Sequence, residues 1–186
     1  RFLCGSLRLL QAVLLSIQQR ISAVLLRQLV AALLRQHDAL RLRFRRNEEG
    51  WSQEIARFDA DERVPVTVLD YANVSDEELR ATIEAEATRV QGGLDLSAGP
   101  LLRVVLFELG AGRGARLLLV IHHLAVDGVS WRILMEDLQR GYEQLAGGER
   151  VEFGAKTSSY QQWAESLQEY GESAALQEQM SYWERV

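Results

Sequence analysis

Residues 116–128 read RLLLVIHHLAVDG and form the most informative segment of the chain. After the first arginine the run is apolar to residue 121, which is typical of a central strand covered on both faces. His122 and His123 follow at the end of that strand, and Asp127 and Gly128 lie in the turn beyond it. Because successive strand side chains point to opposite faces, we expect one histidine to face inward and the other to face a cleft.

Strand and helix patterns continue on both sides of this stretch. Strands are predicted at 11–17, 65–69 and 101–109, with a hairpin of 39–45 and 51–55 around a turn at 47–50. Helices are predicted from Ser22 to about Gln36, from Ser75 to about Gln91 and from Ser130 to Leu145, with two more divided near Gly171. These elements predict an α/β fold of the α+β sandwich type. We expect one mixed, mostly antiparallel sheet with helices packed on it, in a single domain over residues 1–186.

Composition excludes several classes of protein. The 186 residues are 47% hydrophobic, yet the apolar runs are far shorter than the roughly 20 residues that cross a bilayer, so no membrane partner is expected. The single cysteine, Cys4, forms no internal disulfide, which favours a cytoplasmic location. The net charge is -5 and the basic residues are not interleaved with aromatics, which argues against nucleic acid. Because the chain begins with Arg1, we expect it to be part of a longer polypeptide.

Three arginines alternate with apolar residues in the predicted strand at 39–45. Arg41, Arg43 and Arg45 follow Leu40, Leu42 and Phe44 with a period of two. This pattern favours the solvated face of a half-buried strand over a surface that binds phosphate.

The histidine pair carries the strongest candidate chemistry. An exposed histidine at a strand end can take or give a proton near neutral pH, so it is a candidate general base. The Asp127 carboxylate can accept backbone N–H bonds or pair with a buried arginine, and Gly128 permits a sharp turn or a close approach by substrate. No metal site is predicted, since adjacent strand residues diverge and no cysteine or third histidine lies near. Spacing alone allows two structural histidines equally well.

The run from His122 to Gly128 matches the HHxxxDG motif, and the chain resembles the condensation superfamily of nonribosomal peptide synthetases, whose fold resembles chloramphenicol acetyltransferase. Residues 35–41, RQHDALR, and 94–102, LDLSAGPLL, are similar to further segments of that family. Ser130 and Trp131 follow Val129 as in the epimerization form of the motif, and the KTSSY run at 156–160 strengthens this likeness.

This resemblance implies an enzyme that epimerizes, from L to D at Cα, an aminoacyl or peptidyl thioester. The substrate would be carried on the phosphopantetheine of a partner peptidyl carrier protein, and the domain itself would bind no cofactor. His123 would be the acid/base residue, supported by His122, Asp127, Gly128, Ser130 and Trp131. The chain would be the amino-terminal lobe of a two-lobe domain. A glutamate in the other lobe would supply the second proton carrier, so the fragment alone would have little activity.

Other functions remain open at this point. In a condensation domain the same histidine would position or activate an amine that attacks an upstream thioester. A noncatalytic module that recruits a partner protein would keep the fold but would have no chemical need of His122, His123 and Asp127 together. A stand-alone acyltransferase would leave Ser130 and Trp131 unexplained.

Overall fold

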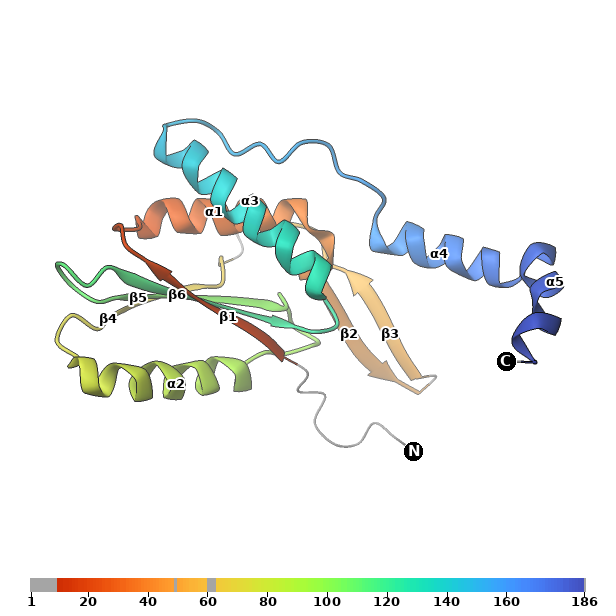
Figure 1. The fold of residues 1–186 in the computed structure, drawn as a ribbon, viewed down its shortest axis with the longest axis horizontal. Helices are drawn as coiled ribbons and strands as arrows, with labels where there is room; N and C mark the ends of the chain where they lie inside the picture. Colours follow the sequence, from red (N-terminus) through yellow and green to blue (C-terminus); the bar gives the residue numbers. More distant parts are fainter. Residues whose placement is uncertain (1–9, 49, 60–62, 186) are drawn as a thin grey trace. The chain divides into compact units, whose positions relative to one another are not determined.

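The computed structural model describes residues 10–48, 50–59 and 63–185, which form two compact units that divide after Phe153 (Figure 1). The first unit holds the sheet with its helices. The second holds α4 (Tyr160–Gly171) and α5 (Ala174–Trp183), as the division near Gly171 predicts. Among the described helices, none combines the length and apolarity that a membrane span requires.

A four-stranded mixed sheet forms the centre of the first unit, with strand order β1-β6-β5-β4. Strand β6 (Ala115–His122) pairs antiparallel with β1 (Leu10–Ile17) and with β5 (Leu102–Glu108), whereas β4 (Val66–Asp70) pairs parallel with β5. The mixed, mostly antiparallel sheet is therefore confirmed.

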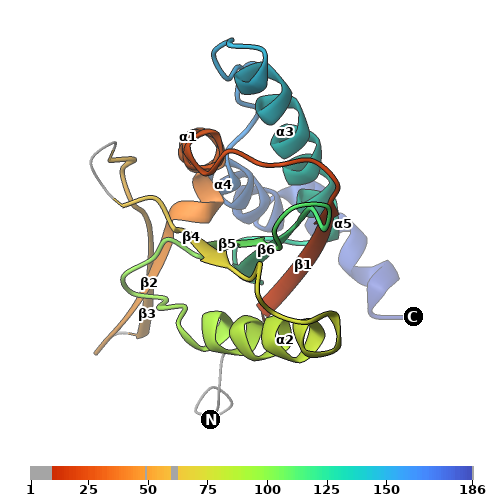
Figure 2. The same cartoon turned by 90° about the vertical axis from the view of Figure 1, so that its left-hand side faces the viewer.

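Helices cover both faces of this sheet (Figure 2). One apolar cluster packs α1 (Ala23–Gln36) and α3 (Gly128–Ala146) against Leu117, Leu119 and Ile121. A second cluster packs α2 (Asp76–Gly92) against Leu118 and Val120 on the opposite face. Alternate residues of β6 thus enter different clusters, and this explains why a central strand needs an unbroken apolar run.

The predicted hairpin forms a sheet of its own rather than joining the four-stranded sheet. Strand β2 (Leu42–Asn47) pairs antiparallel with β3 (Gly50–Ile55). The second strand lies within one residue of its prediction, whereas the first begins three residues late.

The prediction of a strand that begins at Ala39 is wrong for residues 39–41. A 3-10 helix, η1 (Asp38–Arg41), occupies this part. The Arg41 side chain is half-buried rather than solvated, because its guanidinium donates to the Ala56 carbonyl at 2.9 Å, to the Leu34 carbonyl and to the Asp38 carboxylate at 2.7 Å. These contacts turn the chain, so the period of two in the sequence does not reflect a strand here.

Serine side chains cap the first turns of α1 and α2, where the sequence predicts these helices to begin, and also the first turn of α4. Ser22 Oγ accepts the Leu25 N–H at 3.4 Å and begins α1, and Ser159 forms a full capping box with Gln162 at α4. Ser75 accepts the Glu78 N–H at 3.3 Å and begins α2, but the Glu78 carboxylate accepts the Ser75 hydroxyl at 2.8 Å. In a reciprocal capping box the Glu78 carboxylate would accept the Ser75 backbone N–H, whereas here it accepts the Ser75 hydroxyl.

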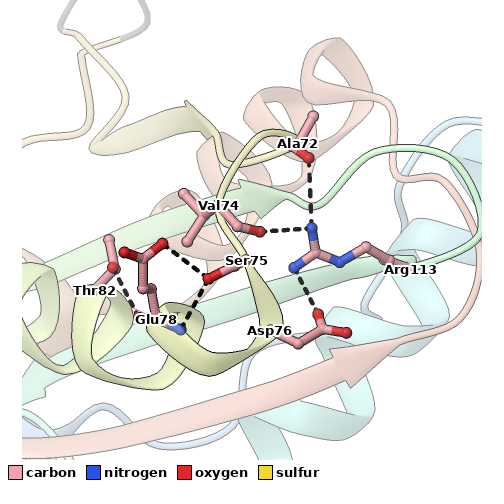
Figure 3. A network of polar contacts seen from close by, with 7 residues as sticks. All are labelled: Ala72, Val74, Ser75, Asp76, Glu78, Thr82 and Arg113. Atoms are coloured by element: carbon pink, nitrogen blue, oxygen red, sulfur yellow. Dashed lines mark hydrogen bonds and ion pairs between the residues drawn. The ribbon is translucent and has the colours of Figure 1, made fainter.

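An arginine in the turn between β5 and β6 ties that turn to the beginning of α2 (Figure 3). Arg113 Nη1 donates to the Val74 carbonyl at 2.8 Å and to the Ala72 carbonyl at 3.4 Å. Its Nη2 lies 2.8 Å from Asp76 Oδ1 as an ion pair without hydrogen-bond geometry. The turn and the loop before α2 thereby hold each other in place.

Helices α1 and α3 lie in close contact at a glycine. Gly141 is buried, and a Cβ built there would lie 2.5 Å from Leu29 Cδ1 and 3.0 Å from Phe153 Cε1. At the end of α1, His37 Nε2 pairs with Asp137 Oδ2 of α3 at 2.8 Å. The packing of these helices fixes the direction of α3, whose first turn follows the histidine pair after the short loop of residues 124–127.

Candidate active site

The two adjacent histidines lie on opposite sides of the end of β6, as strand alternation predicts. His122 is 3% exposed, whereas His123 is exposed. His122 Nδ1 accepts the Leu124 N–H at 3.2 Å, and its carbonyl accepts the Ala125 N–H at 2.8 Å. His122 therefore organises the loop that follows the strand, and His123 is the histidine that a substrate can reach.

The imidazole of His123 is held at both ring nitrogens. Nδ1 lies 2.8 Å from the Val126 carbonyl oxygen, and Nε2 lies 3.2 Å from the side-chain nitrogen of Gln11 on β1. A carbonyl oxygen only accepts hydrogen bonds, so Nδ1 carries the ring proton and the lone pair is on Nε2. An exposed imidazole with its lone pair on Nε2 has the form that a general base requires.

Asp127 accepts a backbone N–H bond, which is the first of the two roles that the sequence left open. It is the N-cap of α3, and its Oδ1 accepts both the N–H and the hydroxyl of Ser130 at 2.7 Å. Because of this cap, α3 begins at Gly128 rather than at Ser130. Hydrogen bonds from Ser130 lower the pKa of the Asp127 carboxyl. The bond from the Ser130 hydroxyl has the larger effect, and the bond from the Ser130 N–H has the next largest.

Gly128 is not required by the packing of the protein. A Cβ built on it would meet no atom within 4 Å, and its φ lies outside the left-handed region that favours glycine. Gly128 therefore makes no left-handed turn, and the interpretation that it permits a sharp turn stays a prediction. A close approach by substrate at this residue stays a prediction.

Trp131 is half-buried against the larger apolar cluster, and it also makes a polar contact that the sequence did not reveal. Its indole N–H donates to the side-chain oxygen of Gln11. Gln11 thus lies beside both Trp131 and His123, although sequence reasoning assigned it no role. The available signal was a glutamine within a predicted strand whose only other polar residue is Ser16.

No cluster of metal ligands accompanies this site. Over the residues that the structure describes, no three histidine, cysteine, aspartate or glutamate side chains come together in a way that would hold a metal ion. The groups gathered near His123 are instead the amide of Gln11, the carbonyl of Val126 and the capped start of α3. Their arrangement suits proton transfer by one imidazole.

Comparison with known proteins identifies the family. The family model for the condensation domain matches residues 6–186. The chain belongs to the condensation-domain family of nonribosomal peptide synthetases. It is 45% identical over 176 residues to a linear gramicidin synthase protein of Brevibacillus parabrevis, in an alignment that covers 93% of this chain and 2% of that protein. The family predicted from the HHxxxDG run is thus confirmed, and the chain spans a small part of this relative.

Solved structures of related domains have the same fold as this chain. The epimerization domain from the third module of tyrocidine synthetase B is 36% identical with a TM-score of 0.86, covering 95% of this chain and 39% of that one. The starter condensation domain of rhizomide synthetase has a TM-score of 0.77 at 23% identity, which is a likeness of fold alone. The chloramphenicol acetyltransferase-like fold class is therefore confirmed.

The lowered pKa of Asp127 predicts a loss of stability in acid. Because the pKa of this carboxyl is lower in the folded than in the unfolded chain, its contribution is complete above the unfolded value of about 3.9. The contribution is lost as the pH falls through the folded value. We expect Asp127→Asn, which keeps an accepting oxygen but does not titrate, to lose less stability than the wild type between pH 6 and pH 3.

Thermal unfolding of the complete domain at both pH values measures this difference. Asp127→Ala serves as the comparison, since it removes the cap and lowers the unfolding temperature already at pH 6. Equal acid losses in the wild type and in Asp127→Asn would contradict the prediction.

Proposed function

We propose that this condensation-family domain epimerizes, in the cytoplasm, the Cα centre of an aminoacyl or peptidyl thioester carried on the phosphopantetheine of a carrier protein. The observation that carries the proposal is the exposed imidazole of His123, whose Nδ1 is held by the Val126 carbonyl at 2.8 Å. Epimerization rather than condensation is supported by the 36% identity to an epimerization domain. It is supported further by Ser130 and Trp131, which match the epimerization form of the motif.

The reaction needs two proton carriers. His123 Nε2 takes the proton from Cα, and the electron pair of the C–H bond moves into the thioester as an enolate. A proton must then reach the opposite face of Cα, where the same imidazole cannot deliver it without moving around the substrate. The chain aligns with 39% of the solved epimerization domain. We infer that it is the amino-terminal lobe and that the second acid, a glutamate by likeness to the family, comes from a carboxy-terminal lobe.

Exchange of the Cα proton tests the proposal directly. A single carrier protein loaded with an L-aminoacyl thioester is incubated in D₂O with the complete domain, and the released amino acid is analysed for deuterium and for chirality. We expect deuterium at Cα together with a mixture of D and L forms. The 186-residue chain alone is expected to form little of the D form, because the acid that would protonate the opposite face of Cα is missing.

Condensation is the second candidate function, because the family model that matches is that of the condensation domain. A condensation reaction needs two loaded carriers and forms a peptide bond, whereas epimerization needs only one. Dipeptide formation from two carriers without exchange on one carrier would replace the proposed function by condensation. A recruitment module would give neither product.

A further inference from the structure

The side chain of Gln11 lies between Trp131 and His123. Its oxygen accepts the indole N–H of Trp131, and its nitrogen lies 3.2 Å from His123 Nε2. On the other side of the imidazole, Nδ1 lies 2.8 Å from the Val126 carbonyl. These contacts form one chain of hydrogen bonds from the first turn of α3, through an edge strand of the sheet, to the carbonyl after the histidine pair.

The two ends of this chain fix the direction of every hydrogen bond in it. An indole N–H can only donate, so the oxygen of the Gln11 amide must face Trp131 and its NH₂ group must face His123. An amide NH₂ group only donates, so His123 Nε2 must accept. The Val126 carbonyl only accepts, so the ring proton is on Nδ1. A reversed amide would set its NH₂ group against the indole N–H, which opposes reversal.

We propose that Gln11, held by Trp131, is a positioning residue that orients the His123 ring and keeps its lone pair on Nε2. The role rests on the epimerization proposed above, in which Nε2 takes the Cα proton. The Gln11 amide N–H donates a hydrogen bond to His123 Nε2 and so orients its lone pair, but it does not transfer its proton. The substrate can therefore displace the Gln11 amide from Nε2. Trp131 then has a function beyond its packing against the apolar cluster.

Three substitutions in the complete domain separate this role from packing. Gln11→Met keeps the length of the side chain and removes both hydrogen bonds, whereas Trp131→Phe keeps an aromatic ring and removes the donor. We expect each to lower kcat for Cα exchange about tenfold, with KM nearly unchanged. Gln11→Glu is expected to lower kcat about a hundredfold, since a carboxylate only accepts and so favours the proton on Nε2. Gln53→Met, at an exposed residue of β3, is the control and should match the wild type.

The tautomer of His123 provides a measurement that does not depend on activity. Nitrogen-15 NMR of histidine-labelled domain, assigned with His123→Ala, should show the proton on Nδ1 in the wild type and in Gln53→Met. It should show a mixed population in Gln11→Met and Trp131→Phe. An unchanged tautomer in these two variants would overturn the inference, and so would an unchanged kcat where the tautomer does shift. Full exchange activity in His123→Ala would remove His123 from the mechanism and overturn the inference with it. No exchange in the wild-type domain would instead remove the proposed function and leave the tautomer result to decide the role of Gln11.

Discussion

His123→Ala in the complete domain is expected to lower the rate of Cα proton exchange at least a hundredfold. General acid–base catalysis by a positioned side chain typically contributes about 10² to 10⁴ in rate. Because His123 is exposed, truncation leaves no cavity in the apolar clusters, and the free energy of unfolding should change little. The loss should therefore fall on kcat, with the carrier-bound substrate still binding.

His122→Ala is the matched comparison for this experiment. His122 is 3% exposed and accepts the Leu124 N–H, so its truncation should destabilise the fold by about 1–3 kcal/mol. Exchange kinetics and urea unfolding of both variants distinguish a catalytic imidazole from a structural one. Unchanged epimerization by His123→Ala would remove this residue from the mechanism and would favour a different base.

Gly114→Ala is expected to destabilise the domain by about 2–4 kcal/mol. Gly114 has a φ of +69°, and a Cβ there would collide with the backbone carbonyl of Ile17 at the end of β1. Ile17 pairs with Ala115 in the register of β1 and β6, so neither strand can move aside without breaking the ladder. The strain falls on the strand that carries Gln11, so exchange activity should fall as well.

Gly112→Ala, in the same turn, is the control for this prediction. Its φ is +81°, but no atom lies within 4 Å of a Cβ built there. The substitution should cost only the backbone strain, about 1 kcal/mol. Urea unfolding with an unchanged m-value measures both variants. Equal losses in the two variants would show that the contact with Ile17 does not matter.

Local rules in the sequence were sufficient for most elements of the fold. Ser22 and Ser75 cap their helices because a serine hydroxyl satisfies N–H groups within the same first turn. The apolar run at 117–121 predicted a central strand because both faces of that strand need cover. Alternation also placed His122 and His123 on opposite sides, since that depends only on the backbone of one strand.

Side-chain hydrogen bonds that the sequence pattern does not specify account for the failures. Residues 39–41 have the period of a strand, but the hydrogen bonds of Arg41 to Leu34 and Ala56 hold them in a 3-10 helix. The start of α3 moved to Gly128 because Asp127 caps the helix, a role that spacing left undecided. Each outcome depends on which partner is nearest in space.

The amino-acid sequence was enough to predict the family, the mixed sheet and a histidine pair with one inward and one accessible member, because motif and strand period act within a few neighbouring residues. Which nitrogen of His123 carries the proton depends on contacts that form only when the chain is folded. The Val126 carbonyl accepts from Nδ1, and Gln11 contacts Nε2 because β1 pairs with β6 and Trp131 of α3 orients its amide. Direction in a hydrogen-bond chain is fixed at its ends, and here the two ends, Trp131 and Val126, are joined through Gln11, which lies more than a hundred residues before either of them along the chain.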